Sequence, residues 1–268
     1  MKNKKESISN NSSSFEGSEI SEFFDEMSHG RNEKINANPI VDYEQNVRSE
    51  IVLNYLSPKS GDKILDIGCG NARDIAYILE QGAEIIGIDI SEGMILEAKK
   101  DLEKLGYKNV TLEVGDATNL AYADNQFDKV LCSEVIEHIP NADKALNEMW
   151  RILKPGGHLI LSTPNPNSWY GFDRYIIWEK IFRKEWPHPY DNWRSLRELL
   201  FMTKTKGFIT KKTAGVCYIP GFIITYFVLP KFIQHPLISI IRIFEPFLSR
   251  RLPQFGYMVC AVVEKNKS

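Results

Sequence analysis

Apolar residues along this chain gather in short runs that end at polar or glycine-rich turns, and helix-like patterns separate the runs. Buried strands are predicted within residues 63–73, 84–91, 110–117, 127–140 and 153–165. Between them, apolar residues recur every three or four positions, which is the spacing of a helix packed on one face. Strands that alternate with helices in this way predict a parallel α/β sheet.

The segments before the first strand differ sharply in composition. Residues 1–20 are rich in Ser, Asn and Lys and are predicted to form a disordered tail, because they cannot bury enough apolar surface to offset the ordering entropy. A short helix is expected over 19–29 and a longer one over 43–56. Residues 21–268 are then expected to form a single domain. One face of the second helix carries Val47, Ile51, Val52 and Leu56.

Beyond the fifth strand the pattern becomes less regular. Residues 166–193 read as an aromatic loop, followed by a helix near 195–206 and a strand from Phe208. The last strand is expected within 255–265. Between these strands lies an apolar insert, 216–248.

The insert is long and apolar, but it is not predicted to span a membrane. Glycines and prolines interrupt its uncharged part, which disfavours a spanning helix. From 237 to 248 the polar positions Ser239, Arg242 and Glu245 recur every third residue and leave a wide apolar face. Two interpretations of the insert remain: it contacts a membrane peripherally, or it packs as a lid or a dimer interface.

Composition narrows the class of protein. With 268 residues, 43% of them hydrophobic and 25% charged, the chain can bury one large core. Its net charge of −2 leaves no basic footprint, so a nucleic-acid partner is not expected. The four cysteines have no close-paired spacing and no signal peptide is visible, which together predict a reducing, cytoplasmic location.

The first strand ends in a glycine loop that points to a nucleotide-like ligand. Gly68 and Gly70 allow positive φ angles and a close approach of backbone to ligand. The dinucleotide pattern G-x-G-x-x-G would need glycine where Arg73 stands, which disfavours NAD and FAD. Asp66, at the strand end, suits a ligand with a cationic amine. S-adenosylmethionine (SAM) carries such an amine.

This loop resembles the first motif of the class I SAM-dependent methyltransferases, acid-x-G-x-G-x-G/A, which Asp66, Gly68, Gly70 and Ala72 match. The resemblance is firmest over residues 63–165. It implies a doubly wound, mostly parallel seven-stranded sheet with helices on both faces and an antiparallel final strand. It also implies that SAM is the cofactor.

Later strand ends supply the other expected cofactor contacts. Asp89 follows the glycine loop by about twenty residues, the position of a carboxylate that holds ribose hydroxyls. Ile90 and Met94 are placed to sandwich adenine, although core packing is the plain alternative for Met94. The resemblance implies that Asp116 accepts a hydrogen bond from the adenine amino group. The predicted cofactor residues are Asp66, Gly68, Cys69, Gly70, Asp89, Ile90, Met94, Asp116, Ala117 and Ser133.

An E-x-x-E-H sequence follows the fourth strand. Its spacing of three and four residues predicts that Glu134, Glu137 and His138 lie on one helical face. Two carboxylates and an imidazole resemble a site for a divalent cation such as magnesium. The resemblance to methyltransferases implies His188 as a fourth ligand. Without a metal, His138 or His188 is the candidate general base. Glu134 completes the predicted catalytic set.

The same E-x-x-E-H occurs in two groups that the chain resembles. These are the ubiquinone-biosynthesis O-methyltransferases and the small-RNA 3′-terminal 2′-O-methyltransferases. The apolar insert and the absence of a basic stripe favour the first group, and hence O-methylation of a lipophilic small molecule such as a prenylated phenol or quinol. The alternatives are the RNA-terminus reaction and a non-catalytic SAM-binding partner subunit. The expected location is the cytoplasm, with peripheral membrane contact.

Overall fold

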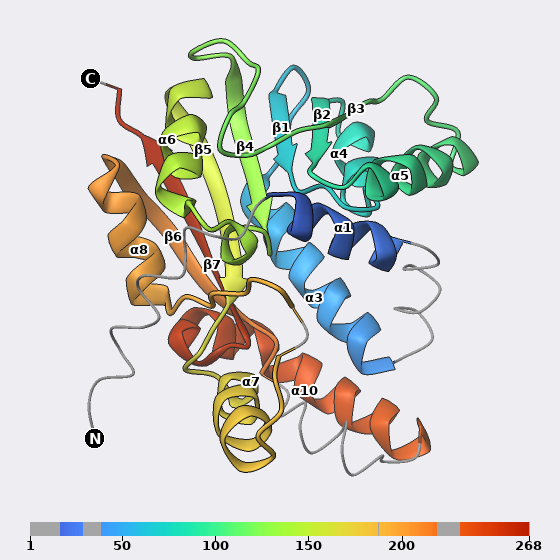
Figure 1. Ribbon diagram of the computed structural model, residues 1–268, viewed down its shortest axis with the longest axis vertical. Coiled ribbons are helices and arrows are strands. Elements are labelled where there is room, and N and C mark those ends of the chain that lie inside the picture. The colour runs from blue at the N-terminus through green and yellow to red at the C-terminus, as the bar shows by residue number, and fades with distance from the viewer. Residues whose placement is uncertain (1–16, 29–38, 187, 219–230, 268) are drawn as a thin grey trace.

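The computed structural model describes residues 17–28, 39–186, 188–218 and 231–267. In this part of the chain, a seven-stranded sheet has the order β3-β2-β1-β4-β5-β7-β6 (Figure 1). The strands are β1 Lys63–Ile67, β2 Glu84–Asp89, β3 Thr111–Val114, β4 Phe127–Ser133, β5 Leu153–Pro164, β6 Phe208–Val216 and β7 Met258–Lys265.

Helices cover both faces of this sheet (Figure 1). The α-helices are α1 Gly17–Ser28, α3 Pro39–Leu56, α4 Ile75–Glu80, α5 Glu92–Lys104, α6 Ala142–Ile152, α7 Trp169–Phe172, α8 Leu196–Thr205 and α10 Lys231–Arg251. The other helical segments are the 3-10 turns η1 Ile136–His138 and η3 Pro253–Phe255, and the π-helix η2 Asp173–Ile181.

The sheet confirms the predicted fold class. Strands β1 to β5 pair in parallel, while β7 runs antiparallel between β5 and β6. The chain order reverses where β1 lies between β2 and β4, and ligands bind beyond the strand ends at such a switch point. The predicted cofactor residues lie at these ends.

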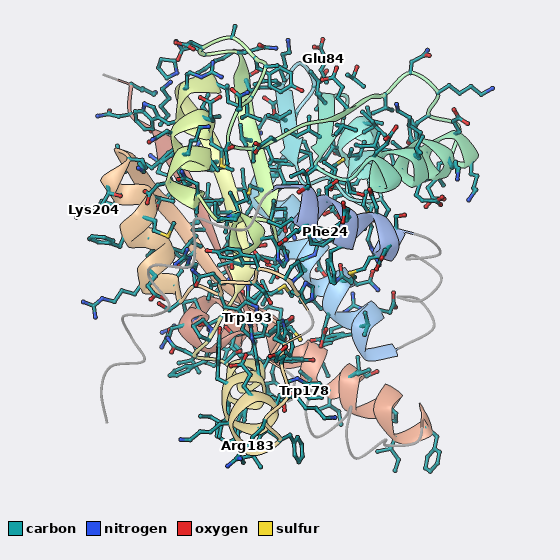
Figure 2. All side chains as sticks on the ribbon, viewed as in Figure 1. Phe24, Glu84, Trp178, Arg183, Trp193 and Lys204 are labelled. Carbon is teal, nitrogen blue, oxygen red and sulfur yellow. The ribbon has the colours of Figure 1, made fainter. Side chains whose placement is uncertain are left out.

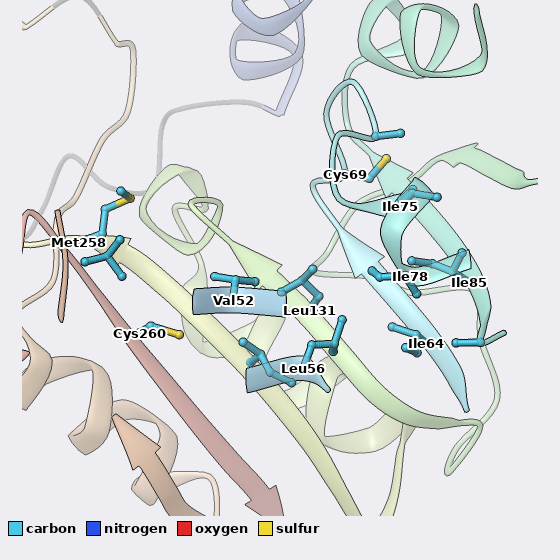
Figure 3. Close-up of a cluster of buried hydrophobic side chains, with 14 of the residues drawn as sticks. Val52, Leu56, Ile64, Cys69, Ile75, Ile78, Ile85, Leu131, Met258 and Cys260 are labelled. Atoms are coloured by element: carbon cyan, nitrogen blue, oxygen red, sulfur yellow. The ribbon is translucent and has the colours of Figure 1, made fainter. Parts of the chain in front are cut away.

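Alternating side chains divide the core into two layers. Ile64 faces the layer under α3, α4 and α5, and its neighbour Leu65 faces the layer under α6 and α8. Figure 3 shows the first layer, where Val52 of α3 lies beside Leu131 of β4. Because strands buried on both faces read as continuous apolar runs, they were visible in the sequence.

Two predicted irregular segments are helical. Helix α1 begins at Gly17, inside the predicted tail, because Ile20 is buried and the Ser21 hydroxyl donates to the Ile90 carbonyl at 3.0 Å. The predicted aromatic loop contains α7 and η2, and the Ser168 hydroxyl caps α7 by accepting from the Gly171 amide at 3.1 Å.

The apolar insert is also largely helical where it is described. Residues 219–230 lie outside the described residues, and α10 occupies 231–251. Among the described helices, none combines the length and the apolar character needed to cross a membrane.

Candidate functional site

One cavity, of about 370 Å³, opens beyond the ends of β1, β2 and β4. Every predicted cofactor residue lines it, and so do Glu134 and His138. Glu137 and His188 are not among the lining residues. The structure thus gathers residues that lie far apart in the sequence around one space, while their roles remain predictions.

The glycine loop at the floor of the cavity is shaped by backbone contacts. Gly68 has φ +69° and its amide donates to the Ile88 carbonyl at 2.8 Å. A Cβ on Gly68 would come within 2.2 Å of the Val135 side chain. At Gly70, with φ +52°, a Cβ would meet no atom within 4 Å. Gly68 is therefore needed for space and conformation, and Gly70 for conformation alone.

The helix after this loop does not begin directly after Gly70. Ala72 adopts φ +59° and α4 begins at Ile75. The loop therefore continues for four residues beyond Gly70 before the helix starts.

Two of the predicted acids are held by the backbone. The Asp89 carboxylate accepts from the Gly70 and Ser91 amides, both at 2.9 Å. Asp116 accepts from the Thr118 amide at 2.7 Å and from its hydroxyl at 2.8 Å. These bonds orient both carboxylates, and each Asp116 oxygen accepts one of them and keeps a second lone pair for a ligand.

Asp66 is buried next to other carboxyl groups. Burial raises its pKa well above the ordinary value, and Asp74 and Asp89 add to the rise, whereas Arg48 opposes it. A carboxyl group in this environment favours a cationic partner.

Arg48 is a site residue that the sequence analysis missed. It lies on α3, lines the cavity, donates to the Ser133 hydroxyl at 2.9 Å and is 3.4 Å from Asp74. Its Nε is buried and has no hydrogen-bond partner among the described residues. The available signal was its position on the apolar face of the predicted helix, three and four residues before Ile51 and Val52.

A directed chain of hydrogen bonds runs from Arg48 to Glu134. Arg48 donates to Ser133, the Ser133 and Ser162 hydroxyls are 2.8 Å apart, and Ser162 donates to Glu134 Oε1 at 2.8 Å. Since Ser162 uses its only hydrogen on Glu134, Ser133 donates to Ser162. Glu134 itself has φ +57°, a conformation that non-glycine residues seldom adopt outside functional or strained positions.

The predicted helical face for E-x-x-E-H is wrong. Glu134 precedes η1 in a left-handed conformation, and η1 is only three residues long. The side chain of Glu137 is buried and 3.9 Å from His138 Nε2. Burial raises the pKa of both glutamates, and the Glu134 carboxyl adds to the rise at Glu137.

These residues do not fit the predicted metal site. Within the described residues, no three His, Cys, Asp or Glu side chains are arranged to hold a metal ion. Glu134 is engaged with Ser162, and the His138 and His188 rings stack face to face, with centroids 5.3 Å apart. Stacked imidazoles do not converge their nitrogens on one point.

His138 is oriented by the chain around it. Its Nδ1 lies 3.1 Å from the Tyr190 carbonyl oxygen, which can only accept, so in the neutral ring Nδ1 carries the proton and Nε2 the lone pair. Phe24 of α1, labelled in Figure 2, meets the His138 ring edge-on at 5.2 Å. On the other side, Trp186 stacks on His188.

Asp191 links this region to an aromatic cage that the sequence did not reveal. It accepts from Arg174 at 2.9 Å, from the Trp186 indole at 2.7 Å and from the Trp193 indole at 2.9 Å. The guanidinium of Arg174 lies 4.7 Å and 4.6 Å from the centres of these two rings. Asp191 Oδ1 is 3.8 Å from His138 Nδ1, so the cage supports the imidazole.

Comparison with known proteins finds relatives of this chain. A family model described as "Methyltransferase domain" matches residues 58–206. The chain is 32% identical over 168 residues to a ubiquinone biosynthesis O-methyltransferase of Thiobacillus denitrificans, covering 61% of this chain and 72% of that protein. It is 34% identical over 128 residues to a demethylmenaquinone methyltransferase of Symbiobacterium thermophilum, covering 45% of this chain and 51% of that protein.

A solved structure agrees on the fold. A Thermotoga maritima protein, described as a SAM-dependent methyltransferase and possible histamine N-methyltransferase, superposes with a TM-score of 0.62 at 20% identity. The alignment covers 90% of this chain and 98% of that one. At this identity the likeness concerns the fold alone.

Proposed function

This chain belongs to the methyltransferase domain family and is a SAM-dependent methyltransferase, and on that premise we propose that it methylates an oxygen of a lipophilic small molecule such as a prenylated phenol or quinol. One observation carries the proposal. The cavity that holds the predicted cofactor residues also holds Glu134 and His138 beside the apolar side chains Ile20, Phe24 and Ile139. The names of the curated relatives support a quinone-type acceptor.

The cofactor residues present fit SAM. Buried Asp66, with its raised pKa, suits the amine, and the unpaired Nε of Arg48 suits a carboxylate at the same end of the cavity. Asp89 and Asp116 are oriented by backbone amides in the cavity, as carboxylates that bind the ribose and the adenine would need to be. When bound, SAM supplies an electrophilic methyl carbon on a sulfonium.

The chain contributes alignment and a base. Since Nδ1 faces the Tyr190 carbonyl, the lone pair of His138 Nε2 can take the proton of an acceptor hydroxyl. The acceptor oxygen then bonds to the methyl carbon as the bond from sulfur to that carbon breaks. Glu137 and Asp191 lie within 4 Å of the imidazole. Because burial raises the pKa of Glu137 and so favours its neutral form, Asp191 is the carboxylate that would favour the imidazolium that results.

The experiment is a methyl-transfer assay with radiolabelled SAM and matched acceptors. A demethylated quinol with a short prenyl tail should be methylated, the same ring without a tail should react more slowly, and a single-stranded RNA end should not react. Mass spectrometry of the product should place the methyl group on oxygen. Methylation of the RNA alone would overturn the proposal.

A further inference from the structure

Helix α10 is apolar on the side that meets the rest of the protein. Ile238 and Ile241 pack against the core layer under α3. Glu245, predicted as a surface position, is instead buried, where it accepts from the Tyr43 hydroxyl at 3.1 Å and from the Cys217 amide at 2.5 Å. These contacts anchor the inner side of α10.

The outer side of α10 is apolar as well. Ile240, Ile243, Phe244 and Phe247 follow the spacing i, i+3, i+4, i+7 and form one stripe along the helix. Their exposed fractions are 55, 74, 56 and 61%. A helix that is apolar on all sides is normally covered, so this stripe marks an interaction surface.

The exposed charges on α10 identify the kind of partner. Arg250 and Arg251 are exposed at the end of the helix, beyond the last residue of the stripe, whereas Arg242 lies away from the stripe and 3.7 Å from Glu50 of α3. The only acid of α10 is the buried Glu245. A second copy packed on the same stripe would bring like charges together, whereas an anionic surface would complement them.

We propose that the outer side of α10 binds the surface of an anionic lipid membrane, with the helix lying along that surface. Large apolar side chains flanked by arginines are what an interfacial helix requires.

This surface lies close to the candidate site. Tyr43 of α3 contacts Glu245 of α10, and Arg48, which lines the cavity, is five residues further along α3, or about 7.5 Å along a helix axis. Figure 1 shows α10 beside α3 at the lower end of the molecule. Membrane binding would bring the cavity near a lipophilic acceptor. That consequence rests on the proposed function, whereas the membrane proposal itself does not.

Flotation with vesicles tests the proposal. The intact protein should rise with phosphatidylglycerol vesicles and far less with phosphatidylcholine vesicles. Changing Ile243→Ser and Phe247→Ser together should lower the floating fraction at least about tenfold, because two large apolar contacts are lost. Arg250→Gln with Arg251→Gln should lower binding by about fivefold per arginine.

A matched control uses exposed apolar side chains elsewhere. Phe201 on α8 and Ile209 on β6 are 68% and 46% exposed, and changing both to Ser should leave flotation unchanged. Circular dichroism should show that every variant is folded.

Three results would overturn the proposal. The intact protein could stay at the bottom of the gradient with phosphatidylglycerol. The stripe variant and the control could float equally. Or light scattering could show a dimer that the stripe substitutions dissociate while no protein floats, which would make a second copy the partner. Methylation of a soluble acceptor without vesicles tests the proposed function separately.

Discussion

Gly68 and Gly70 share a left-handed backbone conformation but differ in what surrounds them. Both residues have positive φ, but only at Gly68 would an added Cβ collide with Val135. The first position therefore combines backbone strain with a steric clash, and the second has strain alone.

Alanine substitutions separate these two effects. Gly68→Ala should weaken SAM binding at least about tenfold, because Val135 or the loop must move away from the position that shapes the cavity. Gly70→Ala should cost only about 1 kcal/mol of stability and weaken binding a few-fold. Titration calorimetry with SAM measures both, and equal losses for the two variants would contradict the assignment of the clash.

His138 should control the pH dependence of turnover. An imidazole base gives a value of kcat/KM that rises with pH through the neutral range. His138→Asn should remove this limb and lower kcat by about 10² to 10⁴. Because the E-x-x-E-H residues do not converge as metal ligands, excess EDTA should leave turnover intact. Loss of activity with EDTA, restored by magnesium, would instead revive the metal prediction.

Among the elements, the segment from α7 to the start of α8 is the one that the sequence described least well. Its aromatic residues were recognised but their arrangement around Arg174 was not, because a cage formed by residues spread along an irregular segment leaves no periodic pattern. Strands β1, β2 and β4 were predictable since buried runs between turns have a strong signal. The E-x-x-E-H geometry was missed because the positive φ of Glu134 is imposed by tertiary contacts.

We predict that Arg174, with the two indoles and the Asp191 carboxylate around it, helps to hold His138 in position. Arg174→Lys keeps the charge but cannot donate to both the Asp191 side chain and its carbonyl, or stack on two indoles. We expect the variant to lose about 1–3 kcal/mol of stability. Because Asp191 faces His138, we also expect a shift in the pH at which kcat/KM rises.

Arg183→Lys is the control, because Arg183 is exposed in the same part of the chain. It should change neither the stability nor the pH profile, both measured alongside Arg174→Lys. If the cage variant loses stability with an unchanged pH profile, Arg174 is structural and does not position the base.

For the whole molecule, a buried carboxyl group outside the cavity should govern part of the pH dependence of stability. Burial raises the pKa of Glu44, which accepts a hydrogen bond from Tyr170, from 4.5 to about 8. The folded state therefore holds this proton more tightly than the unfolded chain. Its stabilising effect is complete below about pH 4.5 and is lost as the pH rises toward 8.

Urea unfolding of Glu44→Gln checks this. Between pH 5 and pH 8, the free energy of unfolding of the natural sequence should fall by roughly 3 kcal/mol more than that of the variant. Glu50→Gln, an exposed position on the same helix, controls for the loss of a charge. Parallel pH curves for the natural sequence and Glu44→Gln would refute the role of Glu44.

The placement of β7 has a consequence for how the protein is made. This strand comes last in the sheet by chain order, yet it lies between β5 and β6 and carries some of the most buried side chains. Until it leaves the ribosome, β6 has no neighbour in the sheet and β5 is an open edge that can pair with other nascent chains. We expect ribosome-bound chains that stop before Met258 to be digested throughout by protease, and chains released from the ribosome with β7 complete to resist. Synthesis would then leave the folding of both core layers to a late step, and chaperones would be needed most at that stage.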